Sequence, residues 1–388
     1  MSQPSQPADQ SSRDMIANCL DRNLLVEAAA GTGKTTSMVR RMVNLVKTGC
    51  CSIETIAAVT FTRKATAELR ERFHAQLEEA RHTATGEQAD RLAQAWVHRE
   101  RCFIGTIHSF CGRLLRERPV EAGVDIGFCE LDETEDLKIR EEAWLQFIAT
   151  AREDSRELMD NLLDVGIELS QLRSAFMEFV RYPDVTDWAP GSAEHPDIEL
   201  LVGYLSPYLG EIEEVAKDFP PNRGNDQLMN KYEEILRTAR QANLANLSSV
   251  MNLLTLFSNR PKVVQRNWPG GREVAKFHEA RWADFQQLIT PHIAQWLQYR
   301  HGLVLAALER AVKVYERHRE ATGGLNFADL LLKAAALLRS NPEVREYFAK
   351  RFTHLLVDEF QDTDPIQAEV VLLLTSENHE TTDWRHCQ

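Results

Sequence analysis

The fold of this chain is decided by the stretch from position 27 to position 36, which reads Glu27-Ala28-Ala29-Ala30-Gly31-Thr32-Gly33-Lys34-Thr35-Thr36. The apolar run Asn23 to Glu27 precedes it, and apolar residues at helical spacing follow it from Met38 to Val46. A glycine-rich turn between a strand and a helix lets backbone N–H groups converge on phosphate oxygens. Lys34 is expected to reach the β and γ oxygens, and the Thr35 hydroxyl to ligate Mg²⁺. The stretch predicts a nucleotide-binding loop at residues 28–36; the alternative is a coincidental match in a loop without nucleotide.

Three further apolar runs have the character of buried strands, and each ends where polar or glycine residues begin. They are Ile56 to Phe61, Phe103 to Thr106 and Thr353 to Val357. Helical patterns lie between or after these runs, so the sequence predicts an α/β fold with a parallel sheet and right-handed crossovers. Such sheets bind ligands beyond the carboxyl ends of their strands, and every motif described here follows such an end.

Two neighbouring carboxylates follow the last run, in the sequence Leu355-Leu356-Val357-Asp358-Glu359-Phe360-Gln361-Asp362. Asp358 is expected to hold Mg²⁺ through its water shell, and Glu359 to orient and deprotonate an attacking water. Gln361 is placed to sense a γ-phosphate. The predicted catalytic set is therefore Lys34, Asp358, Glu359 and Gln361, and the predicted metal ligands are Thr35 and Asp358. Neither motif alone establishes hydrolysis, but two motifs at distant strand ends are hard to explain as surface loops.

The middle of the chain, 131–323, has a different pattern. Long helical patterns such as Glu133 to Ala151 and Ala275 to Ala321 are broken by clusters of Pro, Gly and Asn, which predicts an all-helical insertion. Trp144, Trp282 and Trp296 fall within these patterns, and core packing is a better interpretation of them than base stacking. The predicted organisation is a flexible leader at 1–14, the two parts of an α/β domain at 15–130 and 324–388, and the insertion between them.

Composition narrows the class of protein. The chain has 388 residues, 43% of them hydrophobic, and a formal net charge of −13, which argues against coating of nucleic acid by the whole surface. From Thr60 to Val120, eleven Lys and Arg stand against eight Asp and Glu, which fits a basic track or, equally, a solvated helix face. The seven cysteines include no C-x-x-C pair, so no zinc site is indicated. No apolar run approaches the roughly 20 residues of a membrane span, and we expect a soluble, cytoplasmic protein.

Four segments of the chain resemble motifs I, Ia, Ib and II of UvrD-like superfamily 1A DNA helicases, in that order. These segments are Ala28 to Thr36, Thr60 to Arg70, Gly105 to Phe110 and Val357 to Asp362. Phe327 to Leu331 is similar to the segment that precedes motif II in that family. The alanine-rich form of the loop and the long helical insertion resemble the RecB and AddA branch of helicase-nucleases more than UvrD itself.

The resemblance implies a RecA-like domain of the 1A type with a helical insertion of the 1B type. It also implies a motor that uses ATP and Mg²⁺ to move 3′ to 5′ along single-stranded DNA and to separate duplex, in DNA repair or recombination. By motif position, DNA would lie along Phe61, Thr62, Arg63, Thr106 and His108. Hydroxyls and Arg suit phosphates, and an aromatic ring can stack on a base. Phe61 could instead be a strand-end core residue and His108 a helix-capping side chain, and the family usually has a different residue at Arg63.

The sequence also departs from the family pattern. Ala28 stands where the general loop pattern has Gly, and the place of the adenine-reading glutamine holds Ser12 and Arg13, with Gln10 out of register. After motif II no second RecA-like domain, arginine-bearing motif or nuclease domain follows, so we expect a truncated or split product. The alternative is a non-motor half that binds nucleotide and single-stranded DNA and docks onto a separate C-terminal half or a nuclease partner. A P-loop ATPase unrelated to DNA would not need the Thr60 and Gly105 segments.

Overall fold

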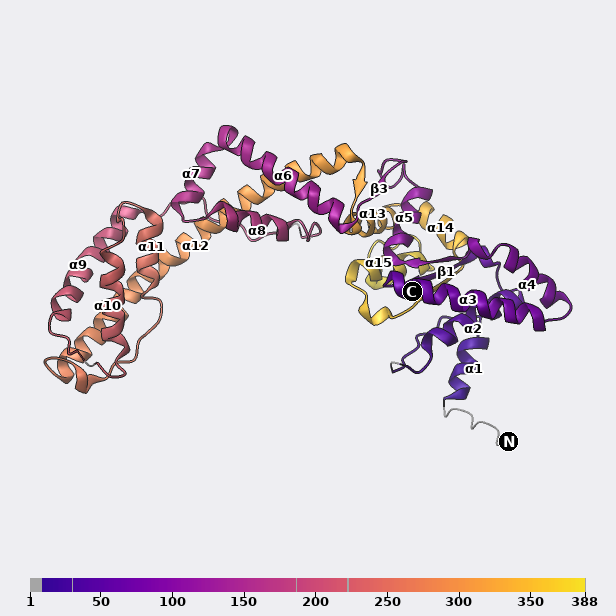
Figure 1. The fold of residues 1–388 in the computed structure, drawn as a ribbon, viewed down its shortest axis with the longest axis horizontal. Helices are drawn as coiled ribbons and strands as arrows, with labels where there is room; N and C mark the ends of the chain where they lie inside the picture. Colours follow the sequence, from indigo (N-terminus) through magenta and orange to yellow (C-terminus); the bar gives the residue numbers. More distant parts are fainter. Residues whose placement is uncertain (1–8, 30, 186, 222, 388) are drawn as a thin grey trace. The chain divides into compact units, whose positions relative to one another are not determined.

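The computed structural model describes residues 9–29, 31–185, 187–221 and 223–387. The chain divides into two compact units. It passes from the first unit to the second at Glu135 and returns to the first at Gly323 (Figure 1). The first unit therefore combines an N-terminal and a C-terminal part of the chain, and the second consists of the residues between them. Among the described helices, none has the length and apolar character that crossing a membrane requires.

The centre of the first unit is a three-stranded parallel sheet in the order β2-β1-β5, of which β1 is labelled in Figure 1. The strands are β1 (Ile56–Thr60), β2 (Phe103–Thr106) and β5 (His354–Val357). Ala57 of β1 pairs with Phe103 on one side and with Leu355 on the other. Three of the four predicted strands are therefore present, and they form the predicted parallel sheet.

The prediction of a strand at Asn23 to Glu27 is wrong. Residues 23–29 pair with no strand in the described part of the chain, and Leu25 and Val26 are 80% and 39% exposed. A strand is defined by backbone pairing with a neighbour, and an apolar composition does not supply that neighbour. The short apolar run before the loop indicated a strand, but no partner lies beside it.

Helices cover both faces of the sheet, and the residues of β1 alternate between two cores. Ala57 and Val59 belong to one hydrophobic cluster, with residues of α5, α13, α14 and α15. Ile56 and Ala58 belong to the other, with residues of α2, α3 and α4. This alternation is the two-residue period of a strand that is buried on both faces. The helices and short 3₁₀ helices of this unit are α1 (Gln10–Asn18), α2 (Lys34–Thr48), η1 (Ile53–Thr55), α3 (Arg63–Thr83), α4 (Glu87–Val97), η2 (Arg99–Arg101), α5 (Ile107–Glu117), α13 (Phe327–Ser340), α14 (Pro342–Arg351), η4 (Phe360–Asp362), α15 (Pro365–Thr375) and η5 (Trp384–His386).

The predicted flexible leader needs a correction at its end. It was expected to extend to Asp14, but α1 already begins at Gln10; residues 1–8 of the leader lie outside those described. The helix is held because α2 offers side-chain donors to its C-terminal carbonyls. Arg41 donates to the carbonyl oxygen of Ile16 at 2.9 Å, and Asn44 to that of Ala17 at 2.9 Å.

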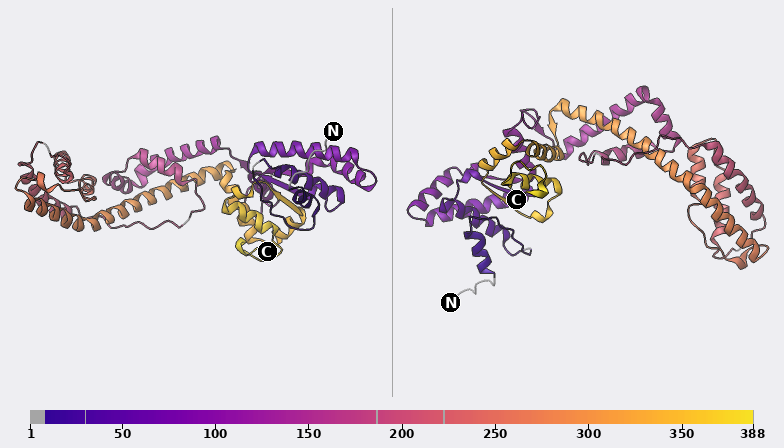
Figure 2. Two further views of the ribbon diagram at one scale, coloured as in Figure 1. Left: turned by 90° about the horizontal axis from the view of Figure 1, so that it is seen from below. Right: turned by 180° about the vertical axis from the view of Figure 1, so that it is seen from behind.

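The second unit is helical in its described residues, and α12 runs along its length (Figure 2). Trp144, Trp282 and Trp296 are 5%, 1% and 5% exposed, so their interpretation as core residues is confirmed. Two short parallel strands of the first unit, β3 (Cys129–Glu130) and β4 (Gly324–Leu325), lie just outside the chain crossings into and out of the second. The helices from the first of these crossings to the second are α6 (Glu133–Asp154), α7 (Arg156–Asp164), α8 (Leu169–Phe179), α9 (Ile198–Ala216), α10 (Gln227–Ala239), α11 (Leu247–Thr255), η3 (Gln265–Asn267) and α12 (Arg272–Thr322).

Candidate nucleotide-binding site

The glycine-rich stretch forms a turn that ends at the N-terminus of α2. Gly31 and Gly33 adopt left-handed backbone conformations, with φ of 77° and 89°, which disfavour residues with a Cβ. Gly33 is the N-cap residue of α2, and no side chain caps this helix. The first-turn N–H groups, including those of Lys34 and Thr35, therefore remain available to an anion. Of the predicted loop residues, Ala30 lies outside those described.

The carboxylate pair is fixed by the sheet. Asp358 directly follows β5, and its N–H donates to the carbonyl oxygen of Val59 at 2.9 Å, which continues the pairing with β1 by one residue. Glu359 has φ of 53° and is the non-glycine residue with a left-handed backbone in the described chain. Such a conformation costs energy and is found most often at functional sites. The backbone thus turns sharply where the second carboxylate leaves the strand.

Three of the four predicted catalytic residues contact one another. Lys34 Nζ lies 3.1 Å from Glu359 Oε2, and Gln361 Nε2 donates to the same oxygen. The lysine and the glutamate are 325 positions apart in the chain. Their contact joins the loop before α2 to the end of β5. It is the arrangement that a nucleotide site needs, with a cation for the phosphates and a carboxylate for the water.

The fourth residue, Asp358, has the opposite electrostatic environment to Glu359. Burial, followed by the charge of Glu359, raises the pKa of Asp358 above its ordinary value. The hydrogen bond from Gln361, followed by that from Lys34, lowers the pKa of Glu359. A half-buried carboxylate and a hydroxyl at Thr35 are hard oxygen donors, and Mg²⁺ commonly takes one or two such protein ligands beside waters and phosphates. The donor set at Thr35 and Asp358 therefore fits Mg²⁺.

The predicted DNA contacts lie after the two other strands. Thr60 at the end of β1 is in register with Thr106 at the end of β2, so the two following turns share one edge of the sheet. Thr62 accepts from the N–H of Ala65 at 3.0 Å, and Thr106 accepts from that of Ser109 at 3.2 Å. Both threonines thus have structural roles as N-caps of α3 and α5.

The three other predicted contacts differ in exposure. Phe61 is half-buried and lies one residue beyond β1, and Arg63 is exposed in the first turn of α3. The ring of His108 packs against that of Phe327 with a centroid distance of 5.0 Å, and burial lowers its pKa. The capping interpretation of His108 is wrong because Thr106 caps α5. A role in binding DNA stays a prediction for all five residues.

One residue beside the loop received no role from the sequence. The guanidinium of Arg13 donates through Nη2 to the carbonyl oxygen of Thr32 at 2.6 Å and pairs with Asp9 at 2.9 Å. The sequence placed Arg13 where a base-reading glutamine was expected, but offered no sign that it contacts the loop. Only the i, i+4 spacing of Asp9 and Arg13 hinted that both lie on a helix.

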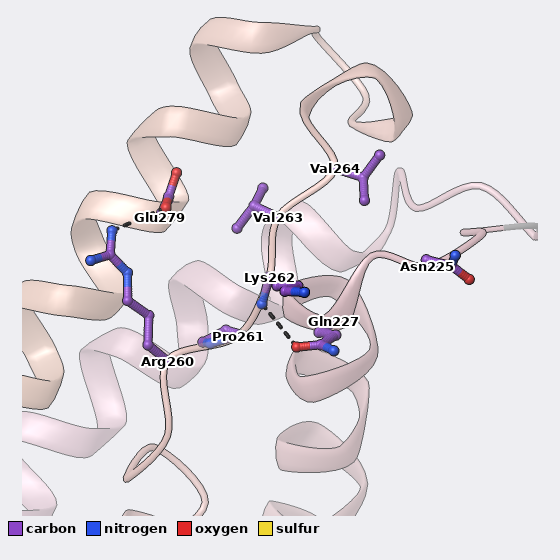
Figure 3. A pocket seen from close by; sticks show the side chains of 8 residues that line it. All are labelled: Asn225, Gln227, Arg260, Pro261, Lys262, Val263, Val264 and Glu279. Carbon is purple, nitrogen blue, oxygen red and sulfur yellow. Dashed lines mark hydrogen bonds and ion pairs between the residues drawn. The ribbon is translucent and has the colours of Figure 1, made fainter.

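A pocket of about 650 Å³ lies in the second unit, apart from every predicted site residue (Figure 3). Arg260 forms an ion pair with Glu279 at 3.1 Å, and the Gln227 amide oxygen accepts from the N–H of Lys262 at 3.0 Å. These polar groups already have partners within the unit. We therefore place the candidate site at the sheet edge and not in this pocket.

Comparison with known proteins agrees with this geometry. Residues 9–382 match the family model described as the UvrD/REP helicase N-terminal domain. The chain belongs to this family. The match includes both parts of the first unit and the whole of the second, so the UvrD-like resemblance of the four motifs is confirmed.

The chain is also similar to several curated bacterial proteins. The chain is 26% identical to an ATP-dependent helicase/nuclease subunit of Lactococcus lactis subsp. lactis, over 92% of this chain and 34% of the relative. It is 25% identical to the protein of the same name from Enterococcus faecalis, over 91% and 32%. A third relative, exonuclease/helicase subunit RexA of Lactococcus lactis subsp. cremoris, is 25% identical over 92% and 34%. These names agree with the predicted AddA-like branch, and the chain spans about a third of the length of these relatives.

Proposed function

We propose that this chain is the ATP-binding part of a DNA helicase motor, which hydrolyses ATP with Mg²⁺ and moves 3′ to 5′ along single-stranded DNA. The observation that carries the proposal is the contact between Lys34 of the loop and Glu359 after β5. It brings a phosphate-binding cation and a candidate general base to one point of the sheet edge. Family membership supports the assignment of that point to nucleotide chemistry.

In the proposed reaction, Thr35 and Asp358 hold Mg²⁺, which would neutralise charge on the phosphates and lower the cost of burying the Asp358 carboxylate. Lys34 leaves Glu359 and binds the β and γ oxygens. Glu359, released from Lys34 as a carboxylate, would then accept the proton of the attacking water, whose oxygen bonds to the γ-phosphorus as the bond to the β,γ-bridging oxygen breaks. Gln361 donates a hydrogen bond to Glu359, and we infer that this amide would respond to the loss of the γ-phosphate.

For DNA, we propose that the strand binds along the turns after β1 and β2. Phe61 would stack on a base, while Thr62, Arg63, Thr106 and His108 would contact the backbone. The side chains of Thr62 and Thr106 cap α3 and α5. We therefore expect the first-turn N–H groups of these helices to contact the phosphates together with the threonines. Repair or recombination is the proposed process, and a cytoplasmic location stays a prediction.

The names of the relatives describe subunits, and we propose that this chain likewise works with a partner of helicase or nuclease type. In a motor with two RecA-like domains, an arginine from the second stabilises the transition state, an effect of about 10³ to 10⁵ in related phosphoryl transfers. A polypeptide tested without such an arginine would then bind nucleotide and DNA and turn over slowly. The same behaviour would be seen in a non-motor binding half.

Steady-state ATP hydrolysis, with and without single-stranded DNA, tests the proposal. We expect Glu359→Gln to retain nucleotide and to lower any turnover by about 10² to 10⁴-fold, the contribution of a general base. Glu377→Gln, which changes an exposed carboxylate elsewhere in the unit, is the matched control. Equal turnover in the wild type and Glu359→Gln would refute the base assignment, and failure of the wild type to bind an ATP analogue would refute the nucleotide site.

A further inference from the structure

The helix α1 lies beside α2 (Figure 1), and side chains of α2 donate hydrogen bonds to its C-terminal carbonyls. Besides the bond to Ile16, Arg41 donates to the carbonyl oxygen of Cys19 at 2.6 Å. Both bonds anchor the C-terminal end of α1 to the helix that directly follows the phosphate loop. The side chains on the loop side of α1 are therefore fixed relative to the loop, although no strand precedes it among the described residues.

Arg13 uses this anchorage to reach the loop. Its side chain is 28% exposed, its Nη2 donates to the carbonyl oxygen of Thr32, and Asp9 holds the guanidinium from the opposite end of the first helical turn. A Cβ built on Gly33 would lie 3.1 Å from Arg13 Nη1, so the guanidinium occupies the space beside that glycine. Arg13 is thus packed onto the peptide that links Thr32 to Gly33.

The planarity of that peptide determines the direction in which the Gly33 N–H points. In a trans peptide the C=O and the N–H point in opposite directions. Because the Thr32 carbonyl oxygen accepts from Arg13, it points toward that side chain, and the N–H of Gly33 points away from Arg13. The same bond occupies a carbonyl oxygen that would repel a phosphate if it turned inward.

We propose that Arg13 is a positioning residue of the phosphate loop: by holding the Thr32 carbonyl toward α1, it leaves the Gly33 N–H free to donate to the phosphates of the bound nucleotide. This inference rests on the proposed nucleotide site and adds a residue from a separate helix to it. Arg13 acts on the loop and not on the base. Its loss should therefore weaken the binding of ATP and ADP alike, because both nucleotides carry the phosphates that the loop would bind.

Titration of the wild-type chain with fluorescent analogues of ATP and ADP tests the inference, beside Arg13→Ala and Arg13→Lys. We expect Arg13→Ala to weaken both nucleotides by about tenfold to a hundredfold, the loss typical of one hydrogen bond to a charged group. Arg13→Lys should recover part of the affinity because an ammonium can still donate to the Thr32 carbonyl. Arg40→Ala is the control, since Arg40 pairs with Asp14 at 3.6 Å across the same two helices.

The outcomes separate the possible failures. If the wild type binds neither nucleotide, the proposed site fails, whatever Arg13 does. Wild-type affinity in Arg13→Ala would overturn the positioning role alone. A loss for ATP with none for ADP would also overturn it, because Arg13 would then contact the γ-phosphate itself. If Arg40→Ala shows the same loss as Arg13→Ala, the effect comes from general docking of α1, and the inference is likewise wrong. The midpoint of thermal unfolding of each variant shows whether the fold is intact.

Discussion

The two sides of the candidate site are anchored in different ways. The carboxylate side follows a paired strand, and the N–H of Asp358 continues the hydrogen bonding to β1. The loop side follows residues that pair with no described strand, and it is held by α1, α2 and the bond from Arg13. One side is therefore fixed by backbone pairing and the other by side chains. We therefore expect substitutions near the loop to change only the loop, and substitutions in the sheet to change the position of the carboxylates.

Removing the cation that joins the two sides should have the largest effect. We expect Lys34→Ala to abolish nucleotide binding, because the phosphates lose the close cation of the loop and Glu359 loses its partner. Lys47→Ala at the other end of α2 is the matched control and should bind normally. A fluorescence titration with an ATP analogue measures both. Unchanged binding by Lys34→Ala would sink the assignment of the loop.

Stability measurements compare the two types of anchorage directly. Ile56 in β1 is 0% exposed and Leu25 before the loop is 80% exposed. We expect Ile56→Ala to lower the free energy of unfolding by about 2–5 kcal/mol, and Leu25→Ala by less than about 0.5 kcal/mol. Denaturant unfolding gives both values. A large loss for Leu25→Ala would mean that residues 23–27 are buried in the folded protein.

The turns after β1 and β2 carry the predicted DNA contacts, and Phe61 is the residue whose loss should weaken binding most. Phe61→Ala should weaken binding of single-stranded DNA by about 1–3 kcal/mol, the usual contribution of a base stacked on an aromatic ring. Phe277→Ala removes an exposed phenylalanine of the second unit and is the control. Fluorescence anisotropy with a labelled oligonucleotide measures the affinity. Equal affinity with an intact fold would make Phe61 a packing residue.

The smallest expected effect is the pH dependence of stability at Asp358. Its folded-state pKa is raised, so its ionisation disfavours the folded state, and the cost appears as pH rises above the ordinary value of 3.8. Asp358→Asn should therefore unfold at a higher temperature than the wild type at neutral pH and at the same temperature below pH 3.8. Thermal scans at the two pH values test the sign. A lower midpoint for the variant at neutral pH would contradict the burial of this carboxylate.

Local patterns in the sequence predicted the parallel sheet, the glycine turn and the pair of carboxylates. Each depends on residues within one short segment, and the parallel order then brings strand ends together. Lys34 contacts Glu359, which also accepts a hydrogen bond from Gln361, although no strand precedes the loop among the described residues.

Predictions from the sequence were wrong or missing where the structure depends on a contact with a distant residue. Residues 23–27 have strand-like composition, but the described sheet offers them no neighbour. The role of Arg13 depends on a bond to Thr32 that crosses 19 positions, and the capping roles of Thr62 and Thr106 compete with their motif positions. Such contacts arise from the packing of separate elements, and no periodic pattern records them.

In the proposed site, the Glu359 carboxylate and the phosphates of the nucleotide compete for the same side chain, Lys34. The Glu359 carboxylate pairs with the lysine that the phosphates would need, so we expect the apparent affinity to be the intrinsic affinity multiplied by the fraction of molecules in which Lys34 is unpaired. By thermodynamic linkage, weakening that pair strengthens nucleotide binding. Glu359→Gln should therefore bind ATP more tightly than the wild type, although it hydrolyses ATP more slowly.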